Sequence, residues 1–137
     1  MKKDKIKVLL VEDDIYMNRI LYDRMTKMGL IVDTYFKAGD AIDMTKNGNK
    51  KYDLIVLDYL FDFYDKTING LELYDYLKRR MPHARGIMVS AFATVDVKNR
   101  AAKMGITDFL DKPFPIGDFT TTVERIISGN QRSQINA

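Results

Sequence analysis

The amino-acid sequence predicts an α/β protein, in which a doubly wound, five-stranded parallel sheet carries helices on both faces. Strand-like and helix-like patterns alternate five times along the 137 residues. Residues 54–57 form a run of four apolar side chains without alternation, which is typical of a strand buried on both faces. Helices between successive strands favour parallel pairing through right-handed crossovers. The chain is therefore expected to form a single domain with a buried core.

The predicted strands are short apolar segments that end in polar or turn-forming residues. The first strand is followed at once by Glu12 and Asp13, and the third by Asp58. Acidic side chains thus stand at the carboxyl ends of two strands. In chain order, the expected strands are residues 5–11, 30–36, 53–57, 85–90 and 106–110.

Between the strands, apolar residues recur at helical spacing. The stripe of the first helix ends before Gly29, a residue suited to the turn after a helix. Pro82 stops the third helix, and Gly105 follows the fourth. The first stripe consists of Ile15, Ile20, Leu21, Met25 and Met28. The later helices are expected at residues 38–46, 70–80, 94–104 and 117–127. We expect one domain over residues 1–129 and a polar tail or linker remnant at 130–137.

The composition excludes several classes of function. The chain has no cysteine, which excludes disulfides and zinc–thiolate sites. It has no apolar run long enough to span a membrane and no recognisable export signal, so we expect a cytoplasmic protein without membrane contact. The net charge is +3, and the densest basic cluster, Lys78 to Arg80, lies at a predicted helix end, where cations complement the helix dipole. We therefore expect no direct binding of nucleic acid.

Polar side chains gather at the carboxyl ends of the predicted strands, where open α/β sheets place their sites. In strand order these are Glu12 and Asp13, then Asp58, Ser90, and Lys112 just past the fifth strand. Carboxylate oxygens without sulfur suit a hard ion such as Mg²⁺ or Mn²⁺, and a lysine with a hydroxyl suits phosphoryl oxygens. Asp58 ends the central strand and is the best candidate for a nucleophile that forms an aspartyl phosphate.

On these residues the sequence resembles the receiver domains of two-component response regulators, over residues 5–128. Five segments carry the resemblance, in family order and at near-family spacing. Residues 90–96 look most like receivers attached to enhancer-binding transcriptional activators. The five segments are VLLVEDD at 8–14, YDLIVLD at 52–58, NGLEL at 69–73, MVSA at 88–91 and DFLDKPF at 108–114.

The resemblance implies a flavodoxin-like sheet of strand order 2-1-3-4-5, as in chemotaxis receivers. It also implies a signalling switch, which catalyses only its own phosphorylation and slow dephosphorylation. Asp58 would accept a phosphoryl group from a sensor histidine kinase or a phosphotransfer protein. Glu12, Asp13 and Asp58 would hold Mg²⁺ together with the backbone carbonyl of Leu60.

The same resemblance assigns the residues of the switch. Ser90 would bond a phosphoryl oxygen and draw its loop inward, while Lys112 would pair with the acyl phosphate. Phe109 falls at the family's aromatic switch position, and the bond from Lys112 to Pro113 is expected to be cis. The movement would change the surface formed by the fourth helix, the fifth strand and the fifth helix, which would control an output domain or partner and could support a homodimer.

Two features depart from the family pattern. The loop at residues 59–69 has no proline, is longer than usual and is rich in aromatic residues, which fits either a tolerated insertion or a role in partner binding or rate tuning. The residues two past Asp58 and two past Ser90 are Leu60 and Phe92. Because apolar side chains orient water poorly, we expect a long-lived aspartyl phosphate.

Two other functions compete with this interpretation. A phosphatase of the haloacid-dehalogenase type also uses Mg²⁺ and an aspartyl phosphate, but it normally needs an acidic residue where Leu60 stands. A pseudo-receiver takes no phosphate, and the retained acidic, hydroxyl and lysine residues argue against it. Asp14 is either a further metal ligand or the residue that opens the first helix, and the second role is the commoner one.

Overall fold

Five parallel strands form one sheet in the order β2-β1-β3-β4-β5, which confirms the predicted flavodoxin-like order. The computed structural model describes residues 5–46, 48, 50–59, 68–106 and 108–136, with residues 130–136 described by backbone alone. The strands are β1 (Lys7–Val11), β2 (Ile31–Tyr35), β3 (Leu54–Asp58), β4 (Arg85–Ser90) and β5 (Asp108–Asp111).

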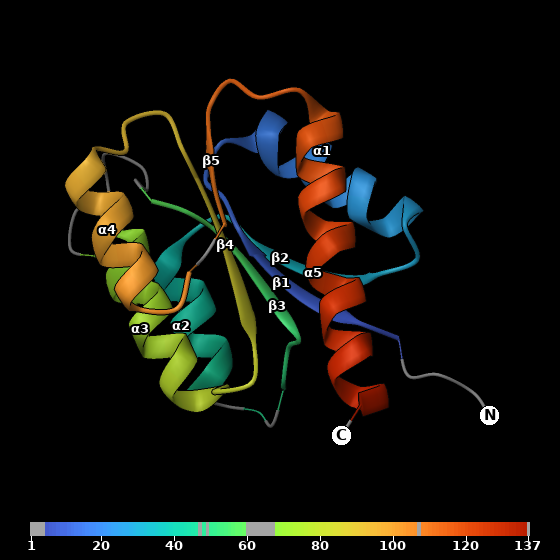
Figure 1. Ribbon diagram of the computed structural model, residues 1–137. Helices are drawn as coiled ribbons and strands as arrows, with labels where there is room; N and C mark the ends of the chain where they lie inside the picture. Colours follow the sequence, from blue (N-terminus) through green and yellow to red (C-terminus); the bar gives the residue numbers. More distant parts are fainter. Residues whose placement is uncertain (1–4, 47, 49, 60–67, 107, 137) are drawn as a thin grey trace.

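Helices cover both faces of the sheet, as expected for a doubly wound fold. Figure 1 shows α1 and α5 on one side of the sheet and α2, α3 and α4 on the other. The helices are α1 (Ile15–Lys27), α2 (Ala38–Lys46), α3 (Gly70–Arg80), α4 (Val95–Lys103) and α5 (Ile116–Asn136). Within the described ranges, none of them is both long and apolar enough to cross a membrane.

The sheet divides the core into two layers. Along β1, Val8 and Leu10 pack into the layer beneath α1 and α5, whereas Leu9 and Val11 pack into the layer beneath α2, α3 and α4. This alternation follows from the two-residue period of a strand. All five residues of β3 are buried, so the strand that ends at Asp58 is held on both faces. The fold thus gives Asp58 a rigid support.

The first helix buries a different stripe from the predicted one. Leu21 and Met25 are buried as expected, but Ile15 is 67% exposed and Ile20 is 49% exposed. The polar residue Asn18 is buried with them instead. Positions 18, 21 and 25 share one helix face, while position 20 lies about 100° around the helix from position 21. The prediction was wrong for Ile15 and Ile20.

Several element boundaries also differ from the predicted ones by one or more residues. The fifth strand begins at Asp108 rather than at Ile106, although Ile106 is buried. The last helix continues to Asn136 instead of ending at Ile127. Its polar final residues include no proline, so nothing in them blocks the continuation of a helix that has already formed. The expected tail at 130–137 is thus helical up to Asn136, and the domain boundary at residue 129 stays a prediction.

Candidate functional site

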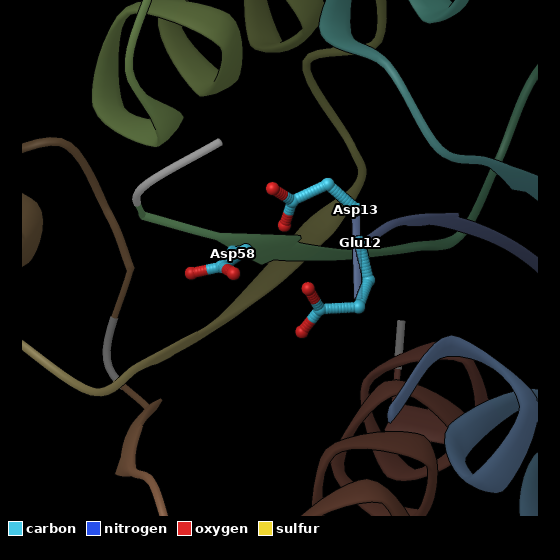
Figure 2. Close-up of side chains that lie close together, drawn as sticks. All are labelled: Glu12, Asp13 and Asp58. Carbon is cyan, nitrogen blue, oxygen red and sulfur yellow. The ribbon is translucent and has the colours of Figure 1, made fainter. Parts of the chain in front are cut away.

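Three carboxylates meet at the carboxyl edge of the sheet. Glu12 and Asp13 follow β1, and Asp58 is the last residue of the neighbouring strand β3, with Val11 paired to Leu57. Figure 2 shows the three side chains grouped at the ends of these two strands. One ligand atom from each residue lies within 4.8 Å of the others. Glu12 is fully buried, Asp58 is 6% exposed and Asp13 is partly buried, so two of the three carboxylates are shielded from water.

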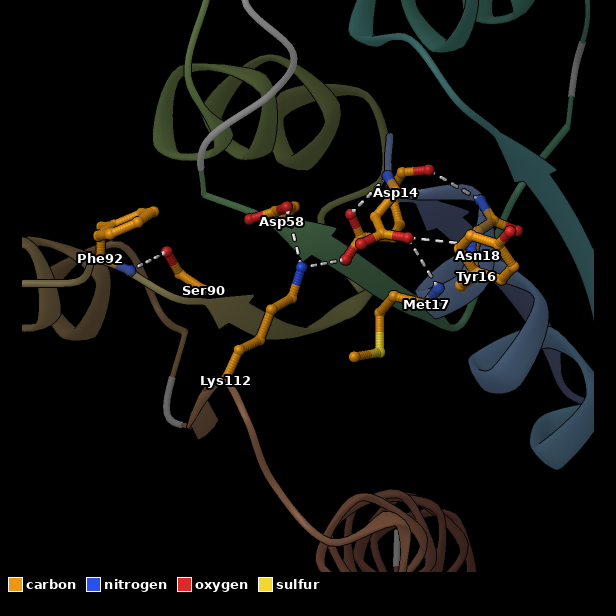
Figure 3. Close-up of polar contacts among 9 residues, drawn as sticks. Asp14, Tyr16, Met17, Asn18, Asp58, Ser90, Phe92 and Lys112 are labelled. Carbon is orange, nitrogen blue, oxygen red and sulfur yellow. Dashed lines mark hydrogen bonds and ion pairs between the residues drawn. The ribbon is translucent and has the colours of Figure 1, made fainter.

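Lys112 brings a positive charge into this group. Its Nζ donates a hydrogen bond to Glu12 Oε1 at 2.5 Å. It also donates to Asp58 Oδ2 at 3.1 Å, a contact that Figure 3 shows. The Lys112 side chain is only 16% exposed. Its backbone N–H donates to the carbonyl oxygen of Ser90 at 2.8 Å, and the peptide bond to Pro113 is cis as predicted. The lysine therefore joins the carboxylates of β1 and β3 to the end of β4.

Ser90 supplies a hydroxyl on the same edge. It is the last residue of β4 and is fully buried. Its Oγ accepts a hydrogen bond from the backbone N–H of Phe92 at 3.2 Å. Because Asp58 pairs with Val89 in the β3–β4 register, the serine follows directly after the strand position beside the aspartate. A hydroxyl, an ammonium and three carboxylates thus share one corner of the molecule.

The buried charges shift each other's proton affinity. Burial and the neighbouring negative charge of Asp58 raise the pKa of Glu12 to about 8, although Lys112 acts in the opposite direction. Burial also raises the pKa of Asp13. For Lys112, burial lowers the pKa, but the hydrogen bond and charge of Glu12 outweigh it, so the pKa is raised overall. The carboxylates are therefore crowded, and added positive charge relieves them.

This donor set fits a hard divalent cation. Carboxylate oxygens without sulfur or imidazole ligands are what Mg²⁺ prefers, and Mn²⁺ accepts the same ligands. Glu12, Asp13 and Asp58 supply these oxygens from two adjacent strand ends. The fourth predicted ligand, the carbonyl of Leu60, lies outside the described residues, as does most of the long loop at 59–69.

Asp14 opens the first helix. Its Oδ1 accepts hydrogen bonds from the backbone N–H groups of Tyr16 at 2.9 Å and Met17 at 3.2 Å. The carboxylate is thus used as the N-cap of α1, which confirms the commoner of its two predicted roles.

Asn18 is a residue of the site that the sequence analysis missed. It is 2% exposed, and its Nδ2 donates to the backbone carbonyl of Glu12 at 3.0 Å. Its Oδ1 accepts from Thr34 Oγ1 at 2.8 Å, so the amide links the end of β1 to the edge strand β2. The available signal was a polar residue three positions before Leu21, on the face that the helix buries. Buried amides at such positions are usually held by specific partners.

Phe109 lies in β5 and is half-buried. Lys98 of α4 places its Nζ 5.6 Å from the centre of the Phe109 ring and forms an ion pair with Asp111 at 2.7 Å. Phe92, just past Ser90, is 73% exposed. Phe109 therefore lies between the edge of the site and α4. Its role as a switch stays a prediction.

Known proteins with similar sequences include transcription regulators and a hybrid signal transduction histidine kinase of Dictyostelium discoideum. The family model described as "Response regulator receiver domain" matches residues 8–124. DNA-binding transcriptional regulator NtrC of Azospirillum brasilense is 29% identical over 123 residues, which cover 90% of this chain and 24% of that protein. Probable transcriptional regulatory protein SilR of Salmonella typhimurium is 26% identical over 124 residues, covering 89% and 51%. The chain thus spans about a quarter to a half of these curated relatives.

Solved structures agree with the fold. A CheY-like response regulator receiver domain protein from Methanospirillum hungatei superposes with a TM-score of 0.82 at 18% identity, covering 95% of this chain and 99% of that one. The non-phosphorylated HemR receiver domain from Leptospira biflexa gives a TM-score of 0.79 at 26% identity, covering 90% and 95%. With the family model matching most of its length, the chain belongs to the response regulator receiver domain family, whose members are signalling domains.

Proposed function

We propose that this chain is a phosphorylation-dependent switch in which Asp58 accepts a phosphoryl group. Receiver domains interact with histidine kinases or phosphotransfer proteins, so the donor is the phosphohistidine of such a partner. The observation that carries the proposal is the position of Lys112 Nζ, which contacts both Glu12 and Asp58 inside a buried carboxylate group. A lysine held at a carboxylate nucleophile is suited to a phosphoryl oxygen that arrives there.

The transfer needs one bond formed and one broken. A carboxylate oxygen of Asp58 attacks phosphorus, the phosphorus–nitrogen bond of the phosphohistidine breaks, and the electron pair leaves with the imidazole. The product is an acyl phosphate on Asp58. Glu12, Asp13 and Asp58, with the Leu60 carbonyl, would hold Mg²⁺, which supplies positive charge for the phosphoryl oxygens when bound.

Lys112 and Ser90 respond to the added charge. Lys112 exchanges its contact with Asp58 for a phosphoryl oxygen, and the Ser90 hydroxyl turns from the Phe92 amide toward another phosphoryl oxygen. The loop after β4 then moves inward and allows Phe109 to change its position. The surface of α4, β5 and α5 follows and controls an output domain, a partner or a homodimer.

The chain hydrolyses its own aspartyl phosphate only slowly. Phe92 is apolar, and Leu60 is the residue two past Asp58, so neither orients an attacking water. We expect the aspartyl phosphate to persist for minutes or longer in Mg²⁺ without a phosphatase. If mass spectrometry after removal of the donor shows that the phosphate is lost within seconds, this expectation is wrong.

The named relatives are DNA-binding or transcriptional regulators. We propose that this chain works in the cytoplasm and that the receiver controls such an output without itself contacting nucleic acid.

The test is mass spectrometry after treatment with acetyl phosphate and Mg²⁺. Wild type should gain one phosphoryl group, and Asp58→Asn should gain none. Asp53→Asn is the matched control, because Asp53 is an exposed carboxylate that precedes the opposite end of β3. A phosphoryl adduct on both wild type and Asp58→Asn, or on neither, refutes the assignment of Asp58.

A further inference from the structure

The start of α3 packs directly against the backbone of the acceptor residue. Gly70, the first residue of α3, is buried. A Cβ at this position would lie 2.3 Å from the carbonyl oxygen of Asp58 and 2.8 Å from the Cα of Tyr59. Both are backbone atoms, which cannot rotate away as a side chain can. Only glycine allows the helix to approach the strand end this closely.

Hydrogen bonds hold the same backbone from two sides. The N–H of Gly70 donates to the carbonyl oxygen of Tyr59 at 2.7 Å, and the N–H of Tyr59 donates to the carbonyl oxygen of Val89 at 3.1 Å. The chain just past Asp58 is therefore fixed to α3 by one bond and to β4 by the other. We call Asp58, Tyr59, Gly70 and Val89 the backbone clamp.

The helix end of the clamp is itself rigid. Asn69 Oδ1 accepts from the backbone N–H of Glu72 at 2.9 Å, and Glu72 Oε1 accepts from the backbone N–H of Asn69 at 3.3 Å. This reciprocal capping box fixes the first turn of α3. The first turn of α3, which contains Gly70, therefore cannot readily shift away from Asp58.

We propose that Gly70 is a positioning residue for phosphoryl acceptance, which acts by setting the place of the Asp58 backbone. The proposal rests on the proposed function of Asp58. The carboxylate lies 3.1 Å from Lys112 Nζ, so a shift of about 1 Å takes it out of hydrogen-bond range. Displacements of that size lower reaction rates by about a hundredfold when they separate reacting groups.

The experiment compares three glycine-to-alanine variants. Gly70→Ala crowds the clamp. Gly86→Ala is the matched control, because its Cβ would lie 2.4 Å from the Tyr74 ring in the core, three residues before Val89 on β4. Gly117→Ala adds a methyl group in α5 with nothing within 4 Å. Each variant is tested at a temperature where circular dichroism shows it folded.

The first readout is the rate of phosphorylation by acetyl phosphate in Mg²⁺. We expect Gly70→Ala to be slower than wild type by about tenfold or more. Gly86→Ala should unfold at a lower temperature yet keep its rate within about twofold. Gly117→Ala should also keep its rate, while its unfolding temperature stays the same or rises slightly. The second readout is the NMR shifts of the Asp58 and Tyr59 amides and their response to added Mg²⁺, which only Gly70→Ala should alter.

Each outcome decides the proposal. A folded Gly70→Ala with a near wild-type rate overturns it, and so does an equal loss of rate in Gly86→Ala. If Gly70→Ala does not fold, hydrogen exchange of wild type decides, because the clamp requires the Gly70 amide to exchange far more slowly than the Gly117 amide. If wild type takes no phosphate, the proposed function of Asp58 fails, and the amide shifts and exchange alone decide whether the clamp exists.

Discussion

Charged side chains meet in two very different regions of this molecule. At the carboxyl edge of the sheet, Lys112 lies between Glu12 and Asp58, and none of the three side chains is more than 16% exposed. On the helix surfaces, pairs such as Arg79 and Asp75 meet at 3.1 Å with 76% and 52% of their side chains exposed. Water and salt screen the second kind, while the first is crowded and costly to bury. Of these two regions, the buried group is therefore expected to respond more strongly to an added charge.

The largest effect is expected from removing the central cation. In Lys112→Met, Glu12 must stay protonated or sit beside Asp58 without a counter-charge. We expect the free energy of unfolding in Mg²⁺-free buffer at neutral pH to fall by about 3 kcal/mol. Phosphorylation by acetyl phosphate should also fall, by about a hundredfold, because the group that answers the phosphoryl charge is gone. Urea denaturation and mass spectrometry measure the two effects.

Lys98→Met is the control for this variant. Lys98 also pairs with a carboxylate, at 2.7 Å from Asp111, but with side chains 38% and 59% exposed. Its loss should change stability by less than about 1 kcal/mol. Equal destabilisation by Lys112→Met and Lys98→Met would show that burial does not separate the two regions.

The pH dependence of stability should single out the buried group. The pKa of Glu12 is raised from 4.5 to about 8 on folding, so between these values the folded chain binds the additional proton. Stability of the Mg²⁺-free protein therefore falls as the pH rises through this window. Glu12→Gln should flatten that fall in a series of urea titrations, whereas the exposed-pair variant Asp75→Asn should leave it unchanged. A urea midpoint of the wild type that rises toward pH 8 would contradict the raised pKa of Glu12.

The sheet and the convergence of its charged strand ends follow from simple patterns. Parallel strands end on the same edge, so placing Glu12, Asp13 and Asp58 at strand ends was enough to predict that they lie together. The strand order was available only through the family resemblance. Periodicity could not tell which helix residues face the sheet, since Ile15 and Ile20 were predicted to be core residues but are 67% and 49% exposed. Helix orientation depends on packing against the sheet, which a single helix sequence does not contain.

Contacts made by backbone and small polar groups were harder to predict. Asn69 and Gly70 stood out as a family motif, but the close approach to Asp58 depends on the path of another strand. The role of Asn18 was harder still to predict, because an asparagine in a helix is ordinarily a surface residue. Its role emerges only when β1, α1 and β2 are assembled and its amide meets Glu12 and Thr34.

A smaller effect is expected from this amide. Asn18→Leu leaves the Glu12 carbonyl and the Thr34 hydroxyl without their partner, which should cost about 2 kcal/mol of stability. Because the Glu12 backbone loses a support, Mg²⁺ affinity should also fall, as measured by NMR titration. Thr34→Val removes one end of the chain of bonds and should cost about 1 kcal/mol while changing Mg²⁺ affinity less. The reverse order of the two affinities would argue against a positioning role for Asn18.

The smallest change in stability is expected when an exposed ion pair is broken. Asp75→Asn breaks the contact with Arg79, but water solvates both partners, so stability should change by less than about 0.5 kcal/mol and even less in high salt. Phosphorylation should be unchanged, since α3 meets the site through its first residue and Asp75 lies beyond its first turn. A loss of phosphorylation in Asp75→Asn at unchanged stability would mean that surface charge on α3 reaches Asp58, and the separation of the two regions would be wrong.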